Sequence, residues 1–167
     1  MVQRSLSFLP LDIDPDVRMV AEGSTEWRLG MWQAVLPMVP QFLLVGKGYS
    51  IDPTEMEIAG GRISSDSTEA MIVSGDYHNG ALTLIIPLGI WGVIGFLWFL
   101  GAGFRVLHRN YRHGDPELRR INTFLLLYFL VKTFCFFVIA GSFQVECYIF
   151  TGLVALSISV NGGVRGP

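Results

Sequence analysis

The chain has 167 residues, of which 51% are hydrophobic and only 16% are charged, and its formal net charge is −2. Its mean hydropathy is +0.47. Soluble domains usually carry a clearly larger share of charged residues, so the composition excludes an ordinary soluble domain. The chain is predicted to be an all-α integral membrane protein with about three transmembrane helices and an external loop region.

The first 79 residues are predicted to form this external loop region. Up to His78 it holds eleven acidic side chains against five basic ones. Residues 49–77 are rich in Ser, Asp, Glu and Gly, which is typical of a surface loop. Such a loop could order over a substrate.

One short amphipathic helix is predicted within the external region, at about residues 25–36. Trp27, Met31 and Val35 recur there at helical spacing. Pro37 should end or kink the helix, because proline cannot continue the backbone hydrogen bonding. A short amphipathic helix with tryptophans is typical of the membrane interface.

A flexible turn is predicted at Gly46-Lys47-Gly48. The Gly-Lys pair partly matches a nucleotide-binding P-loop, but that motif needs an earlier glycine at fixed spacing and a following Ser or Thr. Gly48 occupies the position of the hydroxyl residue, so we reject nucleotide binding. Lys47 remains a candidate for contact with phosphate groups.

Three apolar segments are predicted to cross the membrane, at about residues 80–104, 121–140 and 144–160. A crossing helix needs roughly 20 apolar residues, and the third segment is the shortest. The loop between the first two carries five arginines against two acids. Because short basic loops stay in the cytoplasm, this loop is predicted to lie inside and residues 1–79 outside.

This orientation requires an acidic N-terminal region to be exported, although no apolar signal peptide is visible before it. We therefore expect Met1 to lie inside a longer coding sequence that contains earlier spans. The chain would then be a fragment of a larger polytopic helical bundle.

The segment Asp76-Tyr77-His78-Asn79 stands directly before the first apolar segment, at the predicted boundary between water and lipid. A histidine, with its pKa of about 6.5, could accept a proton from a sugar hydroxyl. Asp76 and Asn79 could orient the ring or bind the sugar, and Tyr77 could stack on it. The alternative is that His78 is only a polar cap of a membrane helix.

Arg28 lies in the predicted interfacial helix, four residues before Trp32. The forked donors of an arginine can bind a pyrophosphate bidentately. The alternative is that Arg28 pairs with lipid phosphate or extends its charge toward the interface.

Lys132 lies near the middle of the second predicted span. A lysine at mid-bilayer costs roughly 2.5–3.5 kcal/mol on insertion scales, so such residues are usually functional or paired. Within this chain we expect Lys132 to be unpaired, with an acid on a further helix as its partner, or to snorkel. Cys135 and Cys147 are expected to act as small hydrophobic residues, and no metal-ligand spacing is visible.

These motifs occur in an order that resembles the C-terminal half of the bacterial O-antigen ligase family, which includes the O-antigen polymerases. The family features are an R-x-x-x-W segment, a G-x-G turn, an H-N pair ending a large periplasmic loop, and a G-x-x-G transmembrane helix. The matching residues are Arg28 and Trp32, Gly46 and Gly48, His78 and Asn79, and Gly89 and Gly92. The resemblance covers roughly residues 4–160, which is less than half of a full family member.

The resemblance implies glycosyl transfer at the periplasmic face of the bacterial inner membrane. The donor would be a glycan on undecaprenyl pyrophosphate, and the acceptor a sugar of lipid A–core or another glycan. By similarity, Arg28 would hold the pyrophosphate and His78 would act as base, while Asn79, Asp76, Tyr77, Lys47 and Trp32 would contact substrate. The resemblance also implies no nucleotide sugar, no cofactor and no catalytic metal, and we expect no nucleic-acid partner.

The chain departs from the family in lacking its N-terminal spans, which carry further arginines and enclose the lipid donor. Alone, the chain is therefore predicted to be inactive, and to need those spans or a partner membrane protein. An alternative is a non-enzymatic truncated paralogue or assembly subunit that binds a partner through helix faces bearing Gly89, Gly92 and Gly95. Within the enzyme class, ligase and polymerase both remain open.

Overall fold

The structure is a computed structural model that describes residues 26, 28–49, 75 and 77–166. All regular secondary structure among these residues is helical. By packing, the chain divides into two units, Met1–Pro37 and Met38–Pro167. Three helices of the second unit are long and apolar enough to cross a membrane, by length and composition. The predicted all-α class and the predicted three long apolar helices are confirmed for this part of the chain.

In the first unit, residues 28–35 are helical. Met31 and Val35 lie one turn apart and are each only 1% exposed. This buried side carries the apolar residues that recur at helical spacing in the sequence. The backbone then tightens into a 3-10 turn, η1 (Leu36–Met38), before the short helix α3 (Val39–Phe42).

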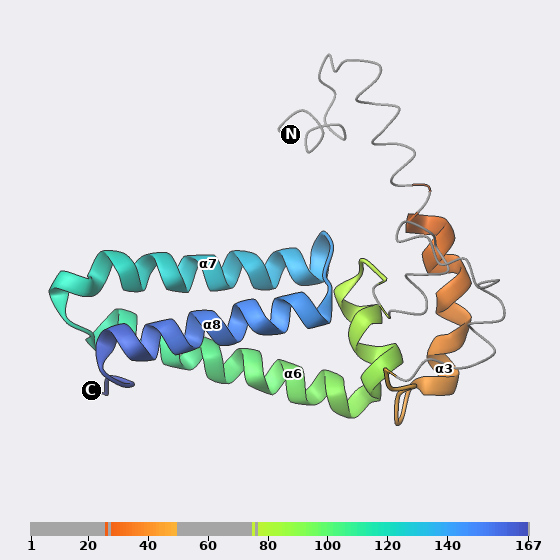
Figure 1. The fold of residues 1–167 in the computed structure, drawn as a ribbon, viewed down its shortest axis with the longest axis horizontal. Helices are drawn as coiled ribbons and strands as arrows, with labels where there is room; N and C mark the ends of the chain where they lie inside the picture. Colours follow the sequence, from red (N-terminus) through yellow and green to blue (C-terminus); the bar gives the residue numbers. More distant parts are fainter. Residues whose placement is uncertain (1–25, 27, 50–74, 76, 167) are drawn as a thin grey trace, which may run out of the picture. The chain divides into compact units, whose positions relative to one another are not determined.

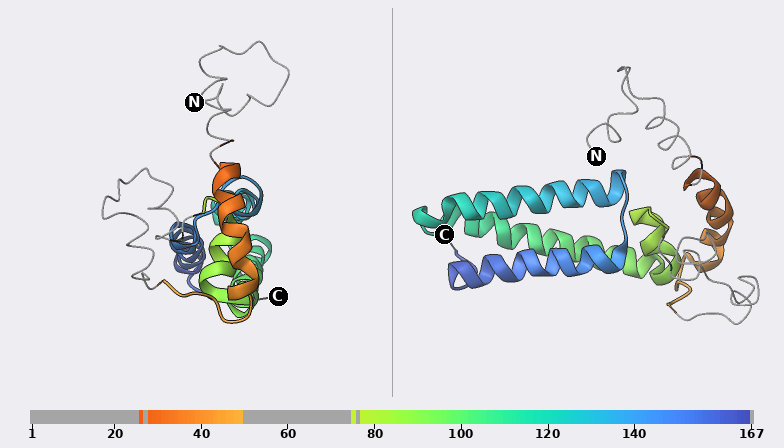
Figure 2. Two further views of the ribbon diagram at one scale, coloured as in Figure 1. Left: turned by 90° about the vertical axis from the view of Figure 1, so that its right-hand side faces the viewer. Right: turned by 45° about the horizontal axis from the view of Figure 1, so that its top comes forward.

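The second unit is built on three long helices, α6 (Gly80–His113), α7 (Arg119–Val138) and α8 (Phe143–Asn161), of which α7 runs antiparallel to the other two (Figure 1). A 3-10 turn, η2 (Pro116–Leu118), leads from α6 into α7. Short connections make consecutive helices antiparallel neighbours, and each of the three helices contacts the other two (Figure 2). We call the two ends of this bundle the 114–118 end and the 139–142 end, after the residues that connect the helices there.

Helix α6 is longer than the apolar segment 80–104 that the sequence marks as a span. It continues through the arginine-rich stretch to His113. Arginine is a good helix former, so a helix does not have to end where its apolar segment ends. By contrast, α7 and α8 begin and end within two residues of the segments 121–140 and 144–160.

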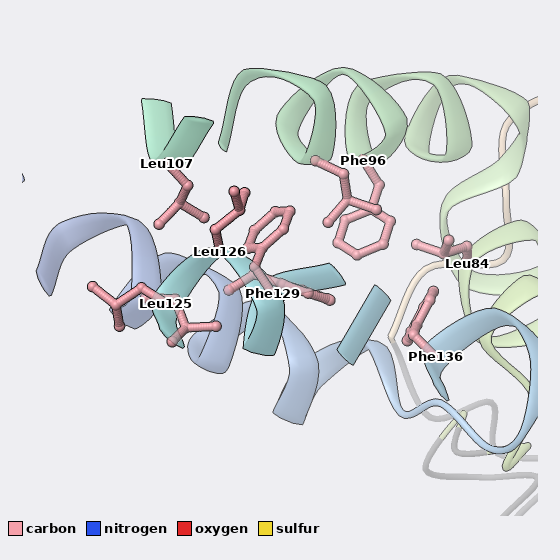
Figure 3. Close-up of a cluster of buried hydrophobic side chains, with 10 residues drawn as sticks. Leu84, Phe96, Leu107, Leu125, Leu126, Phe129 and Phe136 are labelled. Carbon is pink, nitrogen blue, oxygen red and sulfur yellow. The ribbon is translucent and has the colours of Figure 1, made fainter. Parts of the chain in front are cut away.

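A cluster of phenylalanine and leucine side chains fills the space between the three helices (Figure 3). Phe96 of α6 lies against rings of both other helices, with ring centroids 5.2 Å from Phe136 and 6.1 Å from Phe150. Phe129 and Phe150 join α7 to α8 at 5.0 Å. Such aromatic pairs contribute about 0.5–1.5 kcal/mol each beyond the area they bury. The cluster therefore holds α6, α7 and α8 together along their middle.

A buried network of asparagine side chains joins the same helices near the 114–118 end. Asn110, Asn122 and Asn161 come from α6, α7 and α8, and each is at most 2% exposed. The amide of Asn122 donates to the carbonyl of Asn110 and to the side chain of Asn161, both at 3.0 Å. Asn161 donates back to Asn122 at 2.8 Å. Because these buried amides are paired with one another, the network fixes how the three helices meet.

Candidate functional site

Helix α6 is broken at Gly89, which has φ 65° and ψ −170° and is not helical. The first part, residues 80–88, runs at a steep angle to the longer part, residues 90–113 (Figure 1). At a rise of 1.5 Å per residue, the first part is about 13 Å long and the longer part about 36 Å. Only the longer part has the length of a hydrocarbon core of about 30 Å, and its apolar stretch, residues 90–104, accounts for about 22 Å of it. The first part therefore lies across one end of the bundle instead of extending it.

The turn at residues 43–48 supplies the hydrogen bonds that the break in α6 leaves open. Unpaired backbone groups in apolar surroundings cost several kcal/mol each, so a break needs partners from elsewhere in the chain. The turn provides three. The backbone N–H of Lys47 donates to the carbonyl of Ile86 at 2.7 Å, that of Gly48 to Pro87 at 2.8 Å, and that of Ile90 to Leu43 at 2.7 Å.

Two glycines allow the turn and the break to meet backbone to backbone. Gly46 and Gly89 both have positive φ angles, 79° and 65°, a conformation that suits glycine. A Cβ atom on Gly89 would lie 2.7 Å from the nitrogen of Gly46, and one on Gly46 would collide with the carbonyl oxygen of Pro87. Gly89, which was expected to face another helix, therefore faces this turn.

Tyr49 follows the turn and lies near the start of α8. Burial raises the pKa of its hydroxyl, and the nearby Cys147 thiol adds a smaller rise. A group with a raised phenolic pKa stays protonated at neutral pH and can donate a hydrogen bond. Tyr49 is nevertheless 44% exposed, so part of its ring remains accessible.

The segment immediately before α6 lies close to Tyr49 and to the first part of α6. A Cβ atom on Gly75 would lie 3.6 Å from the side chain of Pro87 and 3.6 Å from the ring of Tyr49. His78 comes three residues later, so its Cα lies within about 10 Å of that of Gly75. The turn, Tyr49 and His78 are thus gathered around the first part of α6.

Asn79 caps α6. Its side-chain oxygen accepts hydrogen bonds from the backbone N–H groups of Ala81, at 3.1 Å, and Leu82, at 3.2 Å. Asparagine is among the preferred residues at this position because it satisfies N–H groups that the helix leaves unpaired. The capping role considered for His78 is therefore performed by its neighbour.

His78 and Tyr77 are placed differently although they are adjacent. His78 is half-buried and has φ 49°, in the left-handed region. This conformation is uncommon for residues other than glycine, and such backbone outliers cluster at functional sites. Tyr77 is 1% exposed, so in this conformation its ring is packed inside the protein and does not offer a face for stacking.

The first part of α6 packs against the 139–142 end of the bundle. A Cβ atom on Gly80 would collide with the carbonyl oxygen of Phe136 in the last turns of α7. The hydroxyl of Thr83 lies 3.0 Å from the carbonyl oxygen of Gly80 and 3.3 Å from that of Gly141. These contacts place His78 and Asn79 at the 139–142 end.

Lys132 of α7 pairs with Glu146 in the first turn of α8, with 2.5 Å between Nζ and Oε1. The two side chains are 21% and 9% exposed. The expectation that Lys132 is unpaired within this chain is wrong. Lys132 and Glu146 are equally far in sequence from Ile139, so the antiparallel hairpin of α7 and α8 brings them face to face.

The sequence placed Lys132 near the middle of the segment 121–140, but in the structure the pair lies closer to the C-terminal end of α7. Six residues separate Lys132 from the end of α7 at Val138, which corresponds to about 9 Å of helix. The second carboxylate oxygen of Glu146, Oε2, is buried and has no hydrogen-bond partner among the described residues. This buried oxygen lies near the 139–142 end.

Two of the predicted site residues, Arg28 and Trp32, belong to the first unit. They lie four residues apart on the 28–35 helix, which places them on one face. The Nε atom of Arg28 is buried and has no hydrogen-bond partner among the residues that the structure describes. Asp76 lies outside the described residues.

The structure therefore brings together four of the predicted site residues within the second unit, namely Lys47, Tyr77, His78 and Asn79. Sequence reasoning missed the break in α6, although a proline two residues before a glycine was a usable signal. It also missed Glu146, the only acid in the third apolar segment. Within the described ranges, no three His, Cys, Asp or Glu side chains lie close enough together to hold a metal ion. No known protein family, curated protein or solved structure matches the chain.

Proposed function

We propose that this chain carries catalytic groups of an O-antigen-ligase-like membrane glycosyltransferase. The donor is a glycan on undecaprenyl pyrophosphate, and the acceptor is a hydroxyl of lipid A–core or of another glycan. The observation that carries the proposal is the gathering of the H-N pair and the G-x-G turn around the first part of α6. These motifs are separated in the sequence, yet both are held at one end of a bundle whose helices are long enough to cross a membrane.

The proposed reaction is an inverting displacement at the anomeric carbon of the donor. His78 accepts the proton of the acceptor hydroxyl while that oxygen forms a bond to the anomeric carbon. The bond from this carbon to the pyrophosphate oxygen breaks, and undecaprenyl pyrophosphate leaves with the electron pair. The left-handed backbone of His78, next to a residue that caps α6, supports a fixed position for the imidazole.

In this proposal Arg28 binds the departing pyrophosphate. Its Nε donor is buried without a partner among the described residues, and a buried charged donor is costly unless it has an acceptor. A pyrophosphate oxygen is a suitable acceptor because a guanidinium binds such groups bidentately. Negative charge that develops on the leaving group would then be stabilised where it forms.

The Lys132–Glu146 pair supports substrate binding at the 139–142 end, where His78 lies. Ionisable residues within apolar helices usually mark a functional site, and the pair lies about one helical turn from the end of α8 that faces the 139–142 connection. The Oε2 atom of Glu146 is buried and has no hydrogen-bond partner among the described residues. A sugar hydroxyl would have to displace neighbouring side chains to donate to it.

The deciding experiment replaces His78 by alanine in the gene of the producing organism. Lipid-linked and transferred glycan are separated by gel electrophoresis and detected with a glycan-specific antibody, and an immunoblot reports the amount of the protein in membranes. Loss of a general base typically slows a reaction about 10²–10⁴-fold, so we expect transferred glycan to disappear and lipid-linked glycan to accumulate.

His113→Ala is the matched control, because His113 is exposed in the last turn of α6, at the opposite end of the bundle. It should leave transfer unchanged. Undiminished transfer in H78A, at normal protein amount, would refute the catalytic role.

Arg28→Lys tests the proposed pyrophosphate contact separately. Lysine keeps the positive charge but loses the two parallel N–H donors of the guanidinium. We expect at least about a tenfold loss of transfer relative to Arg109→Lys.

A membrane assembly subunit without catalysis is the alternative function, and one observation favours it. Trp91 and Trp98 lie two turns apart on α6 and are 72% and 78% exposed. Two exposed tryptophans on one side of α6 can pack against another membrane helix. Under this alternative, H78A leaves glycan transfer intact, whereas Trp91→Ala with Trp98→Ala lowers the amount of a partner recovered with the protein.

A further inference from the structure

A second site lies at the other end of the bundle. A pocket of about 200 Å³ opens at the 114–118 end, between the end of α6 and the start of α7. Its five lining residues are Tyr111, Arg112, Gly114, Pro116 and Arg119. Two of the five are arginines and none is an acid, so the charge of the lining itself is positive, while Asp115 and Glu117 lie in the same connection outside the lining.

The base of this pocket is fixed by the asparagine network. A Cβ atom on Gly114 would lie 2.7 Å from Oδ1 of Asn161 and 2.8 Å from Nδ2 of Asn122, so the backbone at Gly114 is seated directly on these buried amides. The backbone N–H of Gly114 donates to the carbonyl of Asn110 at 2.9 Å. The backbone between Arg112 and Arg119 is therefore held in place before a ligand binds, so only the two exposed side chains have to be ordered by the ligand.

The pocket also lies where a lipid headgroup would be. Residues 90–113 and Arg119–Val138 are the two helices that flank it, and both are long enough to cross the hydrocarbon core. In a membrane crossed by these two helices, their polar ends would meet at the level of the interface. Basic pockets between transmembrane helices at that level are suited to anionic headgroups.

We propose that this pocket binds the phosphate of an anionic phospholipid headgroup. Arg112 and Arg119 donate to the phosphate oxygens from two helices, and the hydroxyl of Tyr111 is the remaining side-chain donor in the lining. A zwitterionic headgroup fits less well, because its ammonium group would meet two guanidinium groups. The site is separate from the glycan chemistry and does not depend on it.

The test uses the full chain, purified in a non-ionic detergent and stripped of lipid. Native mass spectrometry measures binding of short-chain phosphatidylglycerol, short-chain phosphatidylcholine and inorganic phosphate. We expect one phosphatidylglycerol to bind about tenfold or more tightly than phosphatidylcholine. The double variant Arg112→Gln with Arg119→Gln should lose about tenfold or more of this affinity.

The control removes the same charge from the same segment outside the pocket. Arg105 and Arg109 are exposed on α6 and do not line the pocket, so R105Q with R109Q should change the affinity by less than about threefold. Equal losses in both double variants would mean a diffuse basic surface and would overturn the site. Inorganic phosphate that binds as tightly as phosphatidylglycerol would overturn its assignment to lipid.

Discussion

Lys132 and Glu146 form an ion pair between two apolar helices, and both charges are held away from water. Such a pair is weak evidence of net stabilisation, because removing two ions from water costs several kcal/mol per ion. Its main consequence is that neither charge can be removed alone without leaving the other buried and unpaired. Here Glu146 is the more buried partner, at 9% side-chain exposure against 21% for Lys132.

We therefore predict that removing one charge is worse than removing both. Lys132→Met leaves the buried Glu146 carboxylate unpaired and should lower the free energy of unfolding by about 3 kcal/mol, since breaking buried pairs costs this order of energy. K132M with E146L should recover most of that loss, because two apolar side chains then meet. Thermal unfolding of the purified protein in detergent measures all three proteins. A double variant less stable than K132M would contradict the argument.

His78 and Asn79 divide two tasks that the sequence alone could assign to either. Asn79 satisfies the first amides of α6, with bonds of 3.1 and 3.2 Å. His78 is then not needed as a cap and adopts a left-handed backbone with φ 49°. The proposed role of His78 as a base therefore does not compete with the capping of α6, which Asn79 performs.

At the scale of the element, the break divides α6 into a short segment and a spanning helix. The break is tolerated because the 43–48 turn pairs with Ile86, Pro87 and Ile90. Discontinuous helices are tolerated within membranes where other protein groups satisfy the freed backbone. The turn and α6 should therefore depend on each other for stability.

We predict that Gly89→Ala destabilises the protein by at least about 2 kcal/mol, because it requires a positive φ and strained backbone costs about 1–3 kcal/mol. Its Cβ would also lie 2.7 Å from the nitrogen of Gly46. Gly95→Ala is the matched control: nothing lies within 4 Å of its Cβ position. It should be neutral or stabilising, since alanine is the better helix former. Equal melting temperatures for both variants would show that the break can close.

At the scale of the whole molecule, the arrangement predicts that the two ends of the bundle face opposite sides of a membrane. Because the arginines cluster between α6 and α7, we expect the 114–118 end to be cytoplasmic. Glu117→Cys and Gln144→Cys place single thiols at exposed positions of the two ends, in a background with Cys135→Ser and Cys147→Ser. A membrane-impermeant maleimide added to intact cells should label Q144C alone, and both thiols after permeabilisation. Labelling of both in intact cells would contradict a crossing by α7.

The sequence alone determined the helical class and the extents of α7 and α8. Length and apolar content are local properties, and a segment of roughly 20 apolar residues forms a helix long enough to cross a membrane almost regardless of its neighbours. The spacing of Met31 and Val35 likewise marked their buried side of the 28–35 helix, since both are 1% exposed. In the same way, Asn79 was correctly placed before the first apolar helix.

Only the tertiary structure decided which distant residues meet. Pro87 and Gly89 permitted a break in α6, but the break persists because a turn some forty residues earlier in the chain pairs with its backbone. The partner of Lys132 depended on how α7 and α8 turn at Ile139, and the asparagine network on where three helices end together. The hydrophobic pattern of each segment determines where helices form. Which helices contact one another is seen in the pairing of their buried polar groups, and these partners come from different segments, so no single segment predicts them.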